Sequence, residues 1–154
     1  MADKKDEKSS PTISNKKAFH EYHILKKIEA GIQLKGSEVK SCRDGKVQLV
    51  DSFASFDKGE LYLQKAHIAE FKQAGPYYNH LATRKRKLLL HKSELRKLDH
   101  ELKSTGQTLI PLRIFFSRGF VKVELGLAKG KKNYDKRQSI KQKDEKRKID
   151  RAMK

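Results

Sequence analysis

A single cysteine, Cys42, occurs among the 154 residues, so no disulfide can form within one chain. With no second thiol, a cysteine-based zinc site within the chain is disfavoured as well. No run of about 18 apolar residues occurs that could cross a membrane. The N-terminus, MADKKDEKSSPT, also lacks the apolar stretch of a signal peptide. These absences predict a soluble cytoplasmic protein from a reducing compartment, without a membrane anchor.

Signatures of catalysis are missing too. The chain has no nucleophile elbow, no phosphate-binding glycine-rich loop and no paired metal carboxylates. The string HEYH at 20–23 is not the HExxH pattern, and on a strand its two histidines would lie on opposite faces. A ribonuclease that pairs His20 with Glu29 is an alternative, but six scattered histidines make such pairs easy to find by chance. We therefore expect no enzyme, no metal and no cofactor.

Positive charge is what the chain has in excess. Lysine and arginine number 37 against 19 aspartates and glutamates, a formal net charge of +18. Residues 129–154 alone hold 12 basic and 4 acidic residues, with few apolar residues that could anchor a core. Such a segment cannot bury enough apolar surface to offset the entropy of ordering it, so a mobile cationic arm is predicted. Nucleic acid is the leading expected partner of this arm.

The distribution of apolar residues divides the chain into three parts. We expect a flexible N-terminus at 1–14, one folded domain at 15–130 and a basic tail at 131–154. The folded part has roughly 110 residues, which suffices for one hydrophobic core and no more. No heptad repeat or large apolar patch indicates a dimer, so a monomer is expected.

Local patterns predict the elements of the first half of the domain. Four stretches of alternating or β-rich composition predict strands: 19–28, 32–34, 47–56 and 61–63. Turn residues separate the members of each pair, at Ala30-Gly31 and at 57–59. Between the pairs, a short helix at 37–42 is predicted to be capped by Ser37 and ended by Asp44-Gly45.

A loop rich in aromatic residues is predicted next. The string FKQAGPYYNHLA at 71–82 contains Gly75-Pro76 and three aromatics. These aromatic side chains must either pack on the body of the protein or stack on a ligand. Packing is the favoured interpretation, and stacking is the alternative.

Two helices are predicted after the loop. The string TRKRKLLLHK at 83–92 is interpreted as a short helix whose leucines turn toward the core. Ser93 is predicted to cap a longer helix, which Gly106 ends. Three leucines of this second helix share one face: Leu95, Leu98 and Leu102.

Two further strands, at 108–116 and 120–127, are joined by Ser117-Arg118-Gly119. The order of elements predicts an α+β fold that is mostly β. We expect an antiparallel closed barrel of the oligonucleotide-binding (OB) type, with about three short helices and a disordered basic C-terminal tail.

Five strings resemble one protein family in their order, spacing and combination. They are NKKAFHEY (15–22), EAGIQLKGSEVKSCRDGK (29–46), VDSFAS (50–55), RKRKLLLHKSEL (84–95) and GLAKGKKNYDKR (126–137). Together they resemble the SmpB family of SsrA-binding proteins. The resemblance covers nearly all of the folded domain and the start of the tail.

The resemblance implies a function. Members of this family bind the tRNA-like domain of tmRNA (SsrA RNA) and deliver it to stalled ribosomes for trans-translation, which rescues the ribosome and tags the nascent peptide. It also implies that the tail is disordered in solution and becomes helical in the empty mRNA channel, beside the small-subunit decoding centre. A generic single-strand RNA-binding or ribosomal protein with the same barrel, without tmRNA specificity, is the alternative.

RNA-binding residues are predicted from the family resemblance and from the positive charge of the chain. The resemblance implies RNA-contacting or site-shaping roles for Asn15, His20, Tyr22, Glu29 and Leu89. A carboxylate such as that of Glu29 can accept hydrogen bonds from base amino groups, and a surface ion pair is its alternative role. Leu89 has a place in the core as its alternative. The basic residues expected to follow the sugar-phosphate backbone are Lys40, Arg43, Arg84, Lys85, Arg86, Lys87, Lys129, Lys131 and Lys132.

The start of the tail combines an aromatic residue with cations. Tyr134 can stack on an unpaired base while Lys136 and Arg137 bind phosphates. The resemblance places this group at the decoding centre of the ribosome. Asp135 interrupts the positive charge, and it can cap the following helix or pair with Arg137.

Overall fold

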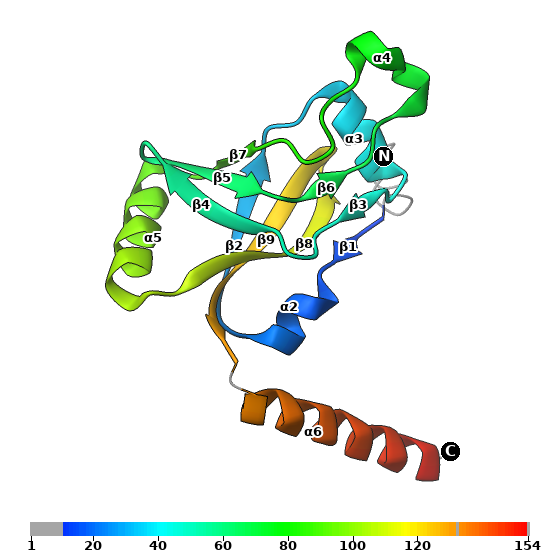
Figure 1. Cartoon of the computed structure of the whole chain (residues 1–154), viewed down its shortest axis with the longest axis vertical. Coiled ribbons are helices and arrows are strands. Elements are labelled where there is room, and N and C mark those ends of the chain that lie inside the picture. Colours follow the sequence, from blue (N-terminus) through cyan, green and yellow to red (C-terminus); the bar gives the residue numbers. More distant parts are fainter. Residues whose placement is uncertain (1–10, 132, 154) are drawn as a thin grey trace.

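One antiparallel sheet forms the body of the protein (Figure 1). The computed structural model describes residues 11–131 and 133–153. The strands of the main sheet are β1 (Ile13–Ser14), β2 (Tyr22–Ile32), β4 (Phe53–Asp57), β5 (Glu60–Gln64), β7 (Arg86–Leu89), β8 (Thr108–Ser117) and β9 (Phe120–Gly130). Their order is β1-β8-β4-β5-β7-β2-β9, and β8 also pairs with β9. The sheet therefore returns on itself through the β8–β9 hairpin. Two short strands, β3 (Val47–Gln48) and β6 (His67–Ile68), pair separately.

The core lies inside this closed sheet because side chains alternate along each strand. Apolar residues from different strands, with at most 1% of their surface exposed, meet there: Leu61, Leu63, Leu88, Leu109, Val123 and Leu125. Each such side chain contributes about 1.5–3 kcal/mol when fully buried. A second, smaller cluster packs helix α2 (Lys16–Glu21) against β8 and β9 through Ala18, Ile110, Leu112 and Ala128.

Five α-helices and one 3-10 turn occur in the part of the chain that the structure describes, against about three helices expected. Besides α2 they are α3 (Gly36–Arg43), a 3-10 turn (Lys72–Ala74), α4 (Gly75–Tyr78), α5 (Lys92–Thr105) and α6 (Asn133–Ala152). Helix α5 follows its prediction, since Leu98 is buried with Leu95 and Leu102 beside it. Gly106 ends this helix in the left-handed conformation that glycine adopts without strain. Its first turn begins at Lys92, with His91 rather than Ser93 in the cap position.

The helix predicted at 83–92 is wrong. Residues 86–89 form β7, which pairs with β5 through Tyr62–Lys87 and with β2 through Ile32–Leu88. Arg86 and Leu88 point inward while Leu89 points outward, which is the period of a strand. The tertiary pairing overrode the helix propensity of the lysine, arginine and leucine run.

The predicted strand at 19–28 is wrong over its first residues. Residues 16–21 form α2 instead, because the Asn15 side chain accepts a hydrogen bond from the amide of Ala18 and caps the helix (3.4 Å). The strand then runs unbroken through Ala30-Gly31, where a turn was expected. Gly31 allows the Leu89 side chain of β7 to lie close to the β2 backbone, since a Cβ atom on Gly31 would be 3.2 Å from the Leu89 Cβ.

Two other expectations for the first half need correction. The stretch at 47–56 is divided into β3 and β4 by a turn in which Asp51 has a φ of 62°. The aromatic loop does not pack as a whole, because Tyr77 is 93% exposed and Tyr78 is 81% exposed, and only Phe71 is half-buried. The hairpin of β4 and β5 around 57–59 follows its prediction.

Helix α6 extends away from the sheet, beyond the end of β9 (Figure 1). Most of its described side chains are exposed, including Ile140 and Ile149. The disorder of this segment in solution stays a prediction. Among the described residues, no helix has the length and apolar character needed to span a membrane.

The strand register of β7 makes a testable prediction about two neighbouring leucines. Leu88→Ala should lower the free energy of unfolding by about 2–5 kcal/mol, because the Leu88 side chain is 1% exposed and leaves a cavity. Leu89→Ala should lower it by less than about 1 kcal/mol, because Leu89 is 49% exposed. Urea denaturation of both variants measures this difference. Equal losses would contradict the register.

Candidate nucleic-acid interface

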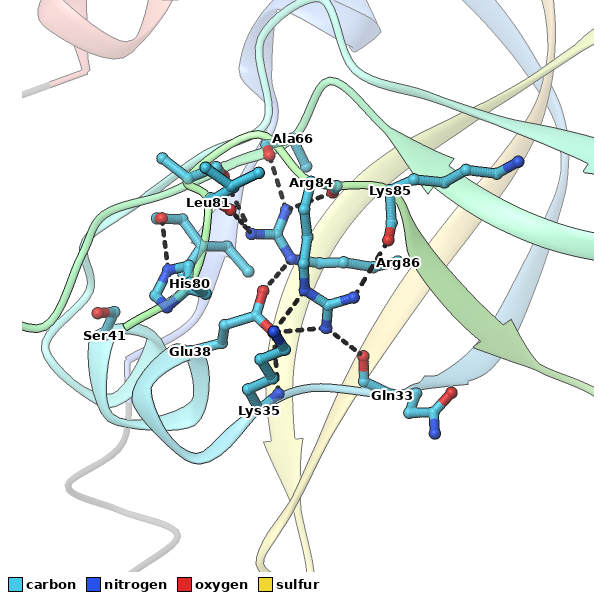
Figure 2. A network of polar contacts seen from close by, with 12 residues as sticks. Gln33, Lys35, Glu38, Ser41, Ala66, His80, Leu81, Arg84, Lys85 and Arg86 are labelled. Carbon is cyan, nitrogen blue, oxygen red and sulfur yellow. Dashed lines mark hydrogen bonds and ion pairs between the residues drawn. The ribbon is translucent and has the colours of Figure 1, made fainter. Parts of the chain in front are cut away.

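A buried carboxylate, Glu38, holds α3 against the segment that leads into β7 (Figure 2). Its side chain has no exposed surface and accepts four hydrogen bonds. Arg84 donates to Oε1 from Nε at 3.1 Å and from Nη2 at 2.6 Å, and Arg86 Nε donates to Oε2. The backbone amide of Lys35 also donates to Oε1, at 2.9 Å, and so closes the first turn of the helix. This carboxylate therefore joins two parts of the chain that lie far apart in sequence, residues 35–38 and residues 84–86.

Arg86 is fully buried and has no N–H group left for a ligand. Besides its bond to Glu38, its Nη1 donates to the carbonyls of Ala66 (2.9 Å) and Arg84 (3.1 Å). Its Nη2 donates to Ala82 (3.0 Å) and, at 3.4 Å, to Leu81. A guanidinium has five N–H donors, and all five are used here. The expectation that Arg86 follows an RNA backbone is wrong, and its role is structural.

The charge state of Glu38 follows from this environment. Burial by itself raises the pKa of Glu38, but the hydrogen bonds from Arg84, the Lys35 amide and Arg86 outweigh it and hold the pKa below its ordinary value. Nearby, burial raises the pKa of the Cys42 thiol to about 12, so this thiol stays protonated. No reactive role for Cys42 follows from this buried position.

A second set of hydrogen bonds, which runs from Ser37 through His80 to Ile68, also holds α3 in place. The Ser37 hydroxyl lies 2.8 Å from Nδ1 of the buried His80, and His80 Nε2 lies 2.9 Å from the carbonyl of Ile68. Because a carbonyl only accepts, Nε2 donates to Ile68, and in a neutral ring Nδ1 then accepts from the Ser37 hydroxyl. Ser37 therefore positions the 66–82 segment, whereas the predicted cap position is occupied by Lys35.

The outer face of β2, β9 and β8 carries a ladder of charges. Glu29 lies directly opposite Glu124, a pair of like charges that by itself destabilises the sheet. Lys122 pairs with Glu29 at 2.9 Å, and Arg113 pairs with Glu124 at 3.0 Å, so each carboxylate has a cation beside it. Exposed pairs of this kind contribute about 1 kcal/mol or less, so a ligand can replace them at little cost.

Leu89 lies on the same outer face. Its strand partner is Gly31, and Glu29 is two residues along β2 on that face. Leu89 is half exposed, so its alternative place in the core is excluded. The register therefore brings Glu29 and Leu89, 60 positions apart in sequence, onto one surface.

The predicted cations of 84–87 have partners within the chain. Lys85 pairs with Asp57 at 2.6 Å and lies over the Tyr62 ring at 4.2 Å. Lys87 pairs with Glu60 at 3.0 Å. Arg84 is committed to Glu38, as described above. The side chains of Lys85 and Lys87 are still 40% and 38% exposed, and Lys87 shares the outer face of β7 with Leu89, so RNA contact by these two residues stays a prediction. Lys40, Arg43 and Lys129 are exposed as well.

Asn15 and Tyr22 shape a hollow between α2 and β8 with a volume of about 220 Å³. The buried Asn15 amide donates to the carbonyls of Leu49 (3.2 Å) and Pro111 (2.9 Å), which fits the site-shaping role. The hollow is smaller than typical small-molecule sites. His20 lies on α2 and β2 begins only at Tyr22, so the HEYH string at 20–23 does not form one strand.

The start of the tail is anchored on α2 through Lys131. Its backbone amide donates to the carbonyl of Glu21 at 2.8 Å. Its Nζ donates to the carbonyl of Phe19 at 3.1 Å and to Ser139 Oγ at 3.0 Å, so one ammonium group bridges α2 and α6. Lys136 and Arg137 follow on the first turns of α6.

Three predicted residues of the tail lie wholly or partly outside the described part of the chain. Lys132 lies outside the described residues. Tyr134 and Asp135 belong to the backbone of α6, and their side chains lie outside the described part. Among the residues that are described, no group of three or more His, Cys, Asp or Glu side chains is placed to hold a metal ion.

Comparison with known proteins identifies the family. Residues 12–154 match the family model described as SmpB protein. The chain belongs to the SmpB family. Two relatives are the SsrA-binding proteins of Trichodesmium erythraeum and Syntrophobacter fumaroxidans. The first is 47% identical over 154 residues, covering 100% of this chain and 99% of the relative. The second is 53% identical over 148 residues, covering 96% and 91%.

A solved structure agrees with the SmpB assignment. Its chain comes from work described as "tmRNA-SmpB: a journey to the center of the bacterial ribosome". That chain is 54% identical, with a TM-score of 0.67, and the match covers 80% of this chain and 87% of that chain. The resemblance found from the five strings is therefore confirmed.

Lys122, Arg113 and Glu124 were not among the predicted site residues. In the sequence, Lys122 and Glu124 alternate with Val121, Val123 and Leu125, which is the signal that could have indicated an outward position. Their pairing with Glu29 depends on the neighbouring strand and could not be derived from one segment.

Acidification tests the buried network. Since the pKa of Glu38 is lower in the folded state, the ion adds stability above the pKa of the unfolded chain, about 4.3, and this stability is lost as the pH falls through the folded pKa. Glu38→Gln should lower the free energy of unfolding at pH 7 by about 3–5 kcal/mol, because Arg86 keeps a buried charge without its partner.

Denaturant titrations between pH 7 and pH 3 measure both effects. The wild type should lose stability below about pH 4.3, and Glu38→Gln should lose less over the same interval. Glu94→Gln, on the exposed first turn of α5, serves as the control and should follow the wild type. An unchanged pH dependence in Glu38→Gln would contradict the assignment.

Proposed function

We propose that this chain binds the tRNA-like domain of tmRNA and delivers it to stalled ribosomes, where it supports trans-translation. Membership in the SmpB family supports this proposal, together with the similarity to a chain of a tmRNA–SmpB structure. The observation that carries it is the surface shared by Glu29 and Leu89. These two residues lie on different strands, β2 and β7, and each is expected to contact RNA. The protein acts as an RNA-binding adaptor of the cytoplasm and not as an enzyme, and its body is a barrel of the OB type.

The charge ladder supplies the chemistry of the contact. Lys122 can exchange its pair with Glu29 for an RNA phosphate, because an exposed ion pair is weak. The freed Glu29 carboxylate then accepts hydrogen bonds from base amino groups, while Leu89 covers a sugar or base face. Arg43 and Lys129 add phosphate contacts that carry no sequence information.

The tail supplies the second contact, with the ribosome. Its cations follow the mRNA channel, and Tyr134 stacks on a base of the decoding centre while Lys136 and Arg137 hold phosphates. Lys131 fixes the point where the tail leaves the body. The tail is disordered in solution and gains its helix when ribosomal phosphates neutralise its charge.

An RNA titration tests the proposed function directly. The protein is titrated against the tRNA-like domain, an elongator tRNA and an unstructured RNA of equal length, at several salt concentrations. A preference for the tRNA-like domain that survives salt is expected from shape recognition. Equal affinities that fall together with salt would indicate phosphate attraction alone and the generic RNA-binding alternative.

Glu29→Ala should weaken binding of the tRNA-like domain by about 10-fold, as expected for the loss of about 1–3 kcal/mol of base recognition. Removal of a negative charge should by itself favour RNA binding, so a loss of affinity cannot come from net charge. Glu94→Ala removes the same charge on α5, which contributes no residue to the ladder, and should bind as well as the wild type or slightly better. Similar behaviour of the two variants would remove Glu29 from the interface.

Truncation after Lys132 should leave binding of the tRNA-like domain within about 2-fold and abolish peptide tagging on stalled ribosomes, since the tail is removed and the sheet face is kept. Tyr134→Ala should reduce tagging strongly, and Tyr134→Phe should restore it because the ring is retained. In vitro translation of an mRNA without a stop codon measures the tagged product. Tagging that persists after truncation would remove the tail from the mechanism.

A further inference from the structure

Two tyrosines project from the top of the molecule with almost no contact to the body. Tyr77 is 93% exposed and Tyr78 is 81% exposed, both on α4, and Leu81 beside them is 76% exposed. Large apolar side chains gathered on one exposed site usually mark an interaction surface. Figure 1 places α4 at the end of the molecule opposite α6, so this surface is separate from the tail.

The loop that carries the tyrosines is held firmly at its base. The Asn79 side chain accepts from the Phe71 amide at 2.9 Å and donates to the Phe71 carbonyl at 2.8 Å, so one amide group closes the loop as a strand partner would. The next residue, His80, is buried and tied to Ser37 and Ile68. Pro76 restricts the backbone at the start of α4. The exposed rings are therefore presented by an ordered backbone, which lowers the entropy lost on binding.

Three lysines lie in or beside the base of this loop. Lys72 is exposed within it, and Lys40 lies over the Phe71 ring at 5.3 Å. Lys46 joins the loop through its carbonyl, which accepts from the Ala69 amide at 3.0 Å. Glu70 is the one acidic side chain of the described segment 69–82. Flat aromatic rings among positive charges match unpaired bases on a phosphate backbone better than they match an apolar protein surface.

We propose that Tyr77 and Tyr78 form a second RNA-binding site, in which the rings stack on unpaired bases of a folded RNA while Lys40 and Lys72 hold its phosphates. The proposal rests on the RNA-binding part of the proposed function, and it adds a contact surface away from the Glu29 ladder. Two sources offer the same chemistry: loop bases of the tRNA-like domain and exposed bases of ribosomal RNA.

A set of matched double variants tests the role of the rings. Tyr77→Ala/Tyr78→Ala removes both rings, Tyr77→Phe/Tyr78→Phe keeps them, and Tyr77→Leu/Tyr78→Leu keeps apolar bulk alone. Because all of these side chains are exposed, the melting temperature should stay within a few degrees of the wild type. Affinity is measured separately for the isolated tRNA-like domain and for ribosomes, so that the two RNA sources are distinguished.

The Ala and Leu variants should bind one of the two partners about 5- to 100-fold more weakly, and the Phe variant should bind within about 2-fold of the wild type. Unchanged affinity of the Ala variant for both partners would overturn the proposal, as would a Phe variant as weak as the Ala variant. If the wild type shows no preference for the tRNA-like domain, the proposed function fails, yet a selective loss of ribosome binding in the Ala variant still supports this site.

A fluorescent reporter separates RNA from protein contacts. The chain contains no tryptophan, so Tyr78→Trp introduces a single indole at the loop. Stacking on a base should quench its emission when the tRNA-like domain or protein-free ribosomal RNA is added. Loss of ribosome binding in the Ala variant without any quenching by either RNA would point to a protein partner and overturn the proposal.

Discussion

The buried carboxylate of Glu38 is the interaction on which the rest of the structure depends. It closes the first turn of α3, binds Arg84 and Arg86, and through Arg86 reaches the carbonyls of residues 66, 81 and 82. The segment between β5 and β7 has little regular structure, so these bonds replace the ladder that a sheet would provide. Removal of one partner from a buried ion pair leaves an uncompensated buried charge, so the arrangement of this region depends on Glu38 and Arg86 together.

Positive charge serves two separate purposes in this protein. Arg84 and Arg86 donate their hydrogen bonds to acceptors within the chain, chiefly the Glu38 carboxylate. Lys85 and Lys87 form ion pairs with Asp57 and Glu60. Further exposed positive charge lies on α3, at the end of β9 and along α6. Arg84 and Arg86 therefore have structural roles, whereas the pairs of Lys85 and Lys87 are exposed and weak, and contact of these two lysines with RNA stays a prediction.

Elements whose signals are local were predictable. Helix α5 has its leucines on one face and a glycine at its end, and the β4–β5 and β8–β9 hairpins have turn residues between alternating strands. Strand β7 was not predictable, because a run of lysine, arginine and leucine favours a helix until β2 and β5 supply hydrogen-bond partners on both sides. Helix α2 was missed for a similar reason, since its cap at Asn15 depends on a side chain that is held by distant carbonyls.

The amino-acid sequence by itself determined the charge, the concentration of basic residues at 129–154, and the family, because composition and the order of motifs are properties of the chain alone. Only the tertiary structure decided which predicted residues are available to a partner. The tertiary structure buries Arg86 and Asn15 and leaves Tyr77 and Tyr78 exposed. It also places Glu29 on one surface with Leu89 and beside its ion-pair partner Lys122. The physical reason is that exposure and pairing are set by contacts between strands far apart in sequence, which no local pattern encodes.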